Sequence, residues 1–174
     1  MQIPFEAPLQ GTASFTVIRD GVSSSAATIV LAPYAPAIFT YLRSSDTIDP
    51  IIVHATTNQL VTPENPAVSG EYVVVYGTGI GDLATLPVTG DLSPSEPSAT
   101  ANVTPVASIG GVQTPVTFAG LTPSSIGLAQ FNLQIPQGLP AGTTALPLVI
   151  TFESASVPTS SRPVSLYVRS QSVP

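Results

Sequence analysis

Residues 103–118 read VTPVASIGGVQTPVTF, and this stretch decides the fold class. Two runs in which apolar and polar residues alternate, 103–109 and 112–118, flank the pair Gly110-Gly111. Glycine accepts the positive φ angles of a type I′ turn, and alternation with a period of two is typical of a strand with one buried face. The stretch therefore predicts a tight antiparallel hairpin.

Short apolar runs of the same kind continue in both directions along the chain. They are rich in Val, Ile, Thr, Phe and Tyr, and turn residues such as Asp20-Gly21 separate them. The 19 Pro and 13 Gly residues are spread over the whole length and interrupt any helical pattern longer than a turn or two. Short strands at this spacing predict a sandwich or a barrel. The expected strands are 13–19, 27–31, 38–42, 51–55, 72–77, 103–109, 112–119, 128–134, 146–152 and 164–169.

The composition limits the possible partners. Of the 174 residues 43% are hydrophobic, which is enough for a packed core, but only 8% are charged. The net charge is −6 and the chain has no Lys. Because phosphate groups are held by clustered Lys and Arg, this balance argues against nucleic acid and against anionic membrane surfaces. The four basic residues are scattered: Arg19, Arg43, Arg162 and Arg169.

The chain contains no cysteine, which removes disulfides, thiolate nucleophiles and cysteine-based metal sites. No apolar run approaches the roughly 20 residues that would span a bilayer, so membrane insertion is not expected. The first residues show neither the basic nor the apolar region of a signal peptide. We therefore expect either a cytoplasmic protein or a piece of a longer exported chain.

Comparison of the chain with itself indicates an internal repeat. Gln2-Ile3-Pro4 recurs as Gln134-Ile135-Pro136, and Gly11-Thr12 recurs as Gly142-Thr143. Each copy continues with an alternating strand, a Ser-rich turn and another apolar strand, although chance agreement in a sequence of low diversity is the alternative. The repeat predicts a partial module at 1–36 that holds the final two strands, a connecting β segment at 37–65 and a complete module at 66–174.

An incomplete module needs a surface to cover its apolar side. We expect Phe15, Val17, Ile29 and Leu31 to be buried, either against the 37–62 region or against a second copy of the chain. A lone hairpin is marginal in water and an open strand edge invites another chain, so a homodimer through the N-terminal repeat is a possible assembly.

Three segments carry a family resemblance: GEYVVVYGTGIG at 70–81, ASIGGVQTPV at 107–116 and GLAQFNLQIP at 127–136. They resemble a TIG-like immunoglobulin fold, and nearly the whole chain is similar to the Solibacter-type uncharacterised C-terminal domain. The resemblance implies an immunoglobulin-like (TIG-like) β-sandwich and an extracellular or cell-surface location. That family has no established activity, so the resemblance carries over no functional residues. The family normally has further sequence ahead of the equivalent of Gln2-Ile3-Pro4.

Two features invite a catalytic or cofactor interpretation. The run Gly77-Thr78-Gly79-Ile80-Gly81 follows a strand, as in dinucleotide-binding folds, but Pro87 and Gly90 prevent the helix that would receive the pyrophosphate. His54, the only histidine, could form a triad with Asp46 or Asp49 and a serine, but no Gly-x-Ser-x-Gly elbow is present. A bend at the end of a strand and a surface or strand histidine are the plainer interpretations. A lone histidine without cysteine also predicts no zinc site.

Acidic and aromatic residues provide the remaining candidates. Asp82, Asp91 and Glu96 lie in or beside a long loop and are weak candidates for calcium ligands, but their spacing matches no calcium loop, so solvated acids are the better interpretation. The five tyrosines offer surface for sugar stacking, although core packing is the commoner fate of such residues.

The sequence thus predicts a non-catalytic structural or interaction module, used for adhesion or spacing in an exported bacterial protein. No catalytic residue, cofactor or metal set emerges, and the protein or glycan partner stays undefined. The alternative hypothesis is a carbohydrate-binding module that uses exposed tyrosines and polar loop residues.

Overall fold

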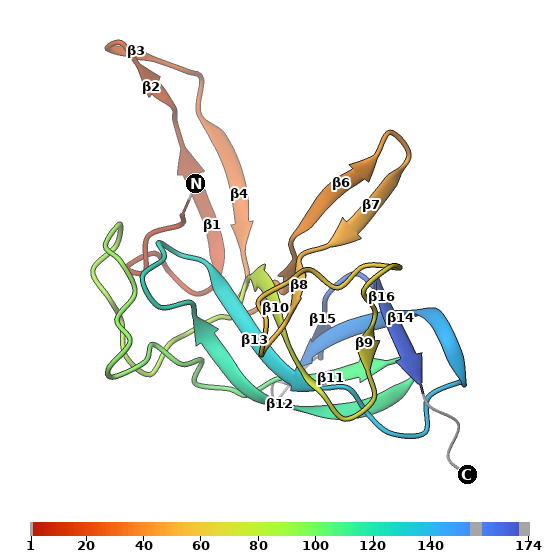
Figure 1. The fold of residues 1–174 in the computed structure, drawn as a ribbon. Coiled ribbons are helices and arrows are strands. Elements are labelled where there is room, and N and C mark those ends of the chain that lie inside the picture. Colours follow the sequence, from red (N-terminus) through yellow and green to blue (C-terminus); the bar gives the residue numbers. More distant parts are fainter. Residues whose placement is uncertain (1, 154–157, 171–174) are drawn as a thin grey trace.

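The computed structural model describes residues 2–153 and 158–170. The described residues form strands joined by turns and loops, and no helix occurs among them (Figure 1). Most strands belong to one continuous hydrogen-bonded sheet that doubles over, and three small two-stranded sheets lie outside it. The prediction of an all-β, sandwich-like protein is therefore confirmed.

All strands of the continuous sheet lie at or after residue 37 of the chain. Its hydrogen-bonded order is β5 (Ala37–Ile38), β10 (Tyr72–Thr78), β13 (Ala129–Gln134), β12 (Val112–Leu121), β11 (Val106–Ile109), β14 (Gly142–Phe152), β16 (Val164–Ser170) and β9 (Ala67–Val68). Two more strands pair at its margins, β8 (Ile52–His54) with β10 and β15 (Thr159–Ser160) with β14. The short β9 pairs in parallel with β16, whereas the other strand pairs of the described residues are antiparallel.

Strand β12 belongs to both halves of this sheet. Its first residues, Val112 to Pro115, pair with β11, and its later residues, Val116 to Leu121, pair with β13. The register shifts between Val116 and Phe118, and such a bulge bends a strand and increases its twist. The bend lets the β10–β13 half face the β11–β14–β16 half.

The core fills the space between these two halves. Alternate residues of β10, β13, β14 and β16 point into it, as a period of two requires. The rings of Phe131 and Phe152 meet edge to face, with centroids 6.4 Å apart, and join the two halves. The side chains that are at most 1% exposed include Val73, Val75, Phe131, Leu133, Leu148, Ile150, Phe152, Leu166 and Val168.

The predicted hairpin at Gly110-Gly111 is confirmed. Ile109 pairs directly with Val112 across the two-residue turn, and the glycines have φ angles of 59° and 83°. Positive values at both central positions are those of a type I′ turn, which matches the twist of the flanking strands. The sequence pattern at residues 103–118 therefore predicts both the turn and the strand pairing.

Two hairpins protrude from the sandwich (Figure 1). The first, here the N-terminal ribbon, covers residues 11–31 and pairs β1 (Gly11–Phe15) with β4 (Ala27–Leu31). Its tip holds the short strands β2 (Ile18–Arg19) and β3 (Val22–Ser23). The second ribbon, residues 40–50, pairs β6 (Thr40–Ser44) with β7 (Thr47–Pro50).

The predicted strand positions agree with the structure over most of the sandwich. Those at 27–31, 51–55, 72–77, 103–109, 112–119, 128–134 and 164–169 match observed strands to within three residues at each end. The predicted strands 13–19 and 38–42 are each interrupted, and β14 starts four residues before the predicted 146. Strand β7 was not predicted, because Asp49-Pro50 is typical of a turn. The Ser-rich turn after Phe152 includes residues 154–157, which lie outside the described residues.

Residues 37–65, assigned from the sequence to a connecting segment, contribute to the sandwich. Strands β5 and β8 both pair with β10, and Ile52 and Val61 belong to the core. Just before this segment, the ring of Tyr34 stacks on Phe152 with centroids 4.6 Å apart. The packed body therefore begins close to Tyr34.

The expected burial of the N-terminal ribbon is only partly observed. Leu31 is buried and Phe15 and Ile29 are half-buried, but Val17 is 58% exposed, so that prediction is wrong for Val17. The ribbon forms no strand pairing with the 37–62 region, because β1 and β4 pair only with each other in the described structure. The apolar face of the ribbon is consequently incompletely covered.

Substitution at Gly79 tests the close approach of the Gly-rich bend to residues 33–36. A Cβ atom at Gly79 would lie 1.8 Å from the carbonyl oxygen of Ala35, and φ is +78°. We expect Gly79→Ala to destabilise the protein by at least about 3 kcal/mol, because the clash adds to the strain of a left-handed backbone. Urea unfolding measures this change.

Gly90→Ala is the matched control, because Gly90 has a similar φ of +89° but nothing within 4 Å of the added Cβ. It carries the backbone strain alone, about 1–2 kcal/mol. Equal losses for the two variants would contradict the assigned contact.

Candidate functional site

The three acids considered as calcium ligands do not converge. Asp82 follows the Gly-rich bend, where its carboxylate accepts hydrogen bonds from the backbone N–H of Leu83 at 3.0 Å and from the amide of Asn102 at 2.7 Å. Asp91 and Glu96 are exposed farther along the loop. No group of three His, Asp or Glu residues that could hold a metal ion occurs within the described ranges. Asp82 instead connects the start of this loop, at Leu83, with its end, at Asn102.

His54 is a buried strand residue that holds β8 against the start of β10. Its Nδ1 lies 2.7 Å from a carboxylate oxygen of Glu71, and its Nε2 lies 3.2 Å from the carbonyl oxygen of Asn65. The two ring nitrogens thus bridge Glu71, which directly precedes β10, and the loop at Asn65. Neither Asp46 nor Asp49, the proposed triad partners, contacts the ring. The geometry matches the interpretation of a strand histidine.

A buried carboxylate anchors the second ribbon to the sandwich. Asp49 on β7 is 1% exposed. It accepts hydrogen bonds from Nε of Arg43 at 2.5 Å and from the hydroxyl of Tyr167, on β16, at 3.0 Å. The hydrogen bond to Asp49 raises the pKa of Arg43. Burial, followed by the negative charge of Asp49, raises the pKa of Tyr41 in the same ribbon.

The Gly-rich bend at residues 77–81 serves packing. Cβ atoms at Gly79 and Gly81 would collide with the backbone of Ala35 and with the ring of Tyr34. No helix follows the bend, as the dinucleotide interpretation would require. The glycines therefore permit the close approach of residues 33–36 to the end of β10.

The tyrosines divide between packing and one exposed position. Tyr72 is 48% exposed, whereas the other four are half-buried. Tyr34 stacks on Phe152, and Tyr167 is held by Asp49. Tyr72 and Tyr76 share the outer face of β10, beside Gln134 and Gln130 of β13.

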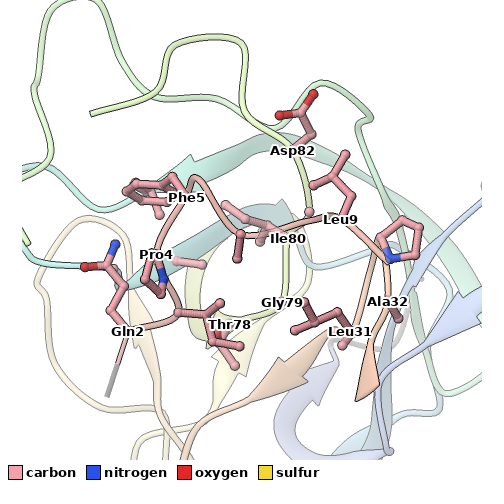
Figure 2. A pocket seen from close by; sticks show the side chains of 18 of the residues that line it. Gln2, Pro4, Phe5, Leu9, Leu31, Ala32, Thr78, Gly79, Ile80 and Asp82 are labelled. Carbon is pink, nitrogen blue, oxygen red and sulfur yellow. The ribbon is translucent and has the colours of Figure 1, made fainter. Parts of the chain in front are cut away.

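A groove of about 730 Å³ lies between the N-terminal ribbon and the end of the sandwich. Figure 2 shows Pro4, Phe5 and Leu9 of the N-terminal segment, Leu31 at the end of β4, and Ile80 of the Gly-rich bend around this groove. The lining is mostly apolar, with Gln2 and Asp82 among its polar members. One wall is thus made by the N-terminal segment, residues 2–9.

A few hydrogen bonds fasten this N-terminal segment to the loop that contains Thr89. The hydroxyl of Thr89 accepts from the backbone N–H of Phe5 at 2.9 Å and donates to the carboxylate of Glu6 at 2.8 Å. The backbone N–H of Gly90 donates to the side-chain oxygen of Gln2 at 3.2 Å. The hydrogen bond from Thr89 lowers the pKa of Glu6.

Large apolar side chains are exposed on both ribbons. On the N-terminal ribbon they are Val17, Ile18, Val22 and Val30, from 58% to 81% exposed. On the second ribbon Leu42 and Ile48 pair directly across the strands and are 65% and 64% exposed. Apolar side chains gathered on protruding elements are typical of contact surfaces. The ribbons are therefore the candidate interaction sites of the molecule.

No family model, curated protein or solved structure matches this chain. Within residues 2–153 and 158–170, none of the elements is a helix of the length and apolarity needed to cross a membrane. The site has to be interpreted from its own geometry.

The second ribbon and its anchor were missed by sequence reasoning. The sequence signal was present in Ser45-Asp46, a pair typical of turns, between two stretches in which Leu42 and Ile48 mark one face. The contact between Asp49 and Tyr167 has no local signal, because 118 residues separate the partners.

Asp49→Asn tests the anchor of the second ribbon. The neutral amide accepts more weakly from Arg43 and Tyr167 and leaves the guanidinium without its ion pair. We expect a loss of about 2 kcal/mol, which corresponds to a melting temperature lower by about 4–8 °C. Calorimetry measures the change. Asp46→Asn is the control, since Asp46 is exposed and accepts a hydrogen bond from its neighbour Ser45, and the melting temperature of this variant should stay unchanged.

Thr89→Val tests the fastening of the N-terminal segment. We expect faster hydrogen exchange at the amide of Phe5 with little change in global stability, because the substitution removes two hydrogen bonds of a peripheral segment. Thr85→Val is the control, a residue of the same loop with no hydrogen bond to residues 2–6 in the described structure. Equal protection of Phe5 in both variants would contradict the assignment.

The same contact predicts a pH dependence. The pKa of Glu6 is lowered in the folded state, so the ionised carboxylate stabilises the docking of the N-terminal segment on the loop at Thr89. This stabilisation is lost as the pH falls through the pKa of Glu6. The protection factor of Phe5 should decrease on acidification in the unchanged chain and stay level in Thr89→Val.

Proposed function

We propose that the chain is a non-catalytic interaction module, an immunoglobulin-like (TIG-like) sandwich that serves adhesion or spacing in an exported bacterial protein. The observation that carries this proposal is the exposure of six large apolar side chains on two ribbons that protrude from a closed core. Folding normally buries apolar side chains. Those that stay exposed together on a protruding element are typical of a surface that a partner covers.

The strand arrangement supports the immunoglobulin-like assignment. Two antiparallel halves share β12 and enclose one core, as the faces of a sandwich do. The three segments that carry the resemblance form consecutive parts of this body: residues 70–81 are β10 with its bend, 107–116 are the β11–β12 hairpin and 127–136 contain β13.

The use of ionisable groups supports a non-catalytic role. His54 is enclosed between Glu71 and Asn65, and Asp49 is enclosed between Arg43 and Tyr167. A general base has to reach a substrate, whereas these groups have their hydrogen-bonding atoms directed to strands and loops of the sandwich.

One observation favours carbohydrate binding as a second function. The outer face of β10 and β13 carries Tyr72 beside polar side chains, with Gln130 donating to Asn132 at 3.2 Å. An exposed aromatic ring with neighbouring amides is a combination that binds sugars. Tyr72 is its single well-exposed ring, however, which leaves little area for stacking.

Co-sedimentation with insoluble cellulose, chitin and xylan decides between the two functions. We expect the unchanged chain and Tyr72→Ala to stay equally in the supernatant. Retention of the unchanged chain that Tyr72→Ala abolishes would replace the interaction module with a carbohydrate-binding module.

A stability measurement tests whether the exposed side chains of the second ribbon contribute to the fold. Side chains kept for a partner contribute little to the fold, so the double variant Leu42→Ser, Ile48→Ser should melt within about 2 °C of the unchanged chain. Leu148→Ala, in the core at 0% exposure, is the reference and should lose about 3–5 kcal/mol. A comparable loss in the ribbon variant would show that these side chains serve the fold itself.

A further inference from the structure

Two short strands, one from each half of the sandwich, have an open edge beside the same groove. In the part of the chain that the structure describes, β5 pairs only with β10, and β15 pairs only with β14. A groove of about 510 Å³ is lined by residues from two segments, 35–40 and 159–164, which contain these strands. Its volume lies in the range of ligand-binding clefts, about 300–1,000 Å³.

The hydrogen bonds around β5 show which backbone groups have no strand partner. The N–H groups of Ala35 and Phe39 donate to the carbonyl oxygens of Gly79 and Tyr76, at 3.1 and 2.9 Å. The backbone groups of successive residues in a strand point to opposite sides. The N–H and C=O groups of Ile38 therefore point away from β10, to the open side of the strand.

The same alternation holds for β15. The N–H group of Ser161 donates to the carbonyl oxygen of Ile150, in β14, at 2.8 Å. The N–H and C=O groups of Ser160 therefore point away from β14. Ser160 and Ile38 both line the groove, so an unpaired pair of backbone groups is available on each side of it.

The side chains around the groove are neutral with one exception. Of the described residues that line it, Arg162 alone is charged. Arg162 is exposed and takes part in none of the salt bridges between described residues. Pro36 and Pro163 lack an N–H group, which confines strand pairing to the short stretches between them and the open edges. The groove thus combines two strand edges with one unpaired cation.

We propose that this groove binds an extended peptide segment of another protein. The segment pairs with β5 on one side and β15 on the other as an added strand, and it places an Asp or Glu carboxylate beside Arg162. In strand addition the main-chain hydrogen bonds supply affinity and the side-chain contacts supply specificity. The site does not include the exposed apolar side chains on which the proposed function rests, so it goes beyond that function.

A second copy of this chain fits the groove less well. The open-edged strands that it could insert are β1 and β4 of the N-terminal ribbon. Their sequences, GTASF and ATIVL, contain no carboxylate for Arg162. The nearest acid of that ribbon, Asp20, lies 3.7 Å from the guanidinium of Arg19.

A random dodecapeptide library provides the probe. Peptides displayed on phage are selected on the immobilised full chain, and the most enriched one is synthesised with a fluorescent label for anisotropy measurements of Kd. We expect the enriched peptides to alternate β-branched with other residues and to contain an Asp or Glu. Failure to enrich any such peptide overturns the proposal.

N-methylation of the peptide tests strand pairing without changing the protein. One series methylates the odd-numbered residues and the other the even-numbered residues, so that each series removes the N–H donors on one side of the added strand. Because the strand lies between two edges, both series should weaken binding by at least about tenfold. A loss in one series alone, or in neither, overturns the proposal.

Ser160→Pro blocks one edge of the groove. It removes the N–H group on the open side of β15 and leaves the pairing with β14 in place, so binding should weaken by at least about fivefold. Ser160→Ala is the matched control, because both variants lose the hydroxyl that lies 2.9 Å from the hydroxyl of Thr151. Equal affinities of the two variants, with unchanged melting temperatures, contradict pairing at β15. If Ser160→Pro does not fold, the N-methylated peptides decide.

A double-mutant cycle tests the carboxylate. Arg162→Gln should weaken binding about threefold, as expected for an exposed ion pair, and the peptide with its Asp or Glu replaced by the amide should lose as much. The two changes together should cost no more than either alone. Arg169→Gln removes the same charge outside the groove and should leave Kd unchanged. Fully additive losses overturn the contact with Arg162.

Hydrogen exchange locates the bound peptide. The amides of Ile38 and Ser160 should exchange at least about tenfold more slowly in its presence, and the amides of the N-terminal ribbon should not change. Slowing in either ribbon instead of at these two amides overturns the proposal.

Light scattering without peptide supplies the last outcome. A dimer that protects Ile38 and Ser160, with the protection lost on dilution, assigns the groove to a second copy and overturns the proposal. Each of these failures leaves the proposed function standing, because that function is decided by co-sedimentation and by the variants of Leu42 and Ile48.

Discussion

The division of strand β12 between two partners is the constraint on which the rest of the structure depends. β12 pairs with β11 at its start and with β13 at its end, so this one strand belongs to both halves of the sheet. The two halves can pack face to face only if β12 bends between them. The bulge near Val116 provides the bend. Only with this bend do the alternating side chains of both halves meet, as the contact between Phe131 and Phe152 shows.

The parts of the fold that depend on local pattern were predictable. Gly110-Gly111 between alternating runs specifies a turn type, and the period of two specifies which side chains of β10 and β13 enter the core. The parts that depend on distant partners were not. Strand β7 ends in Asp49-Pro50, which looks like a turn until Arg43 and Tyr167 are seen to satisfy the buried carboxylate.

The candidate site shows the same limit. Val17, Ile18 and Val30 have the residue types of a core strand, and nothing in their local sequence distinguishes them from the buried side chains of β14. Exposure is decided by whether a facing sheet is present, which a residue pattern does not encode. His54 is the only histidine of the sequence, but its partner Glu71 lies 17 residues away and is brought to it only by the pairing of β8 with β10.

The link between Asp49 and Tyr167 has a consequence for the order of folding. Asp49 and Tyr167 are 118 residues apart, so the hydroxyl that completes the anchor is synthesised only after strands β8 to β15, which lie between β7 and β16. Contacts of such large sequence separation form late, after the loops between them have closed. The second ribbon should therefore acquire its final orientation only when β16 docks. The orientation of this ribbon then indicates that the sandwich is complete.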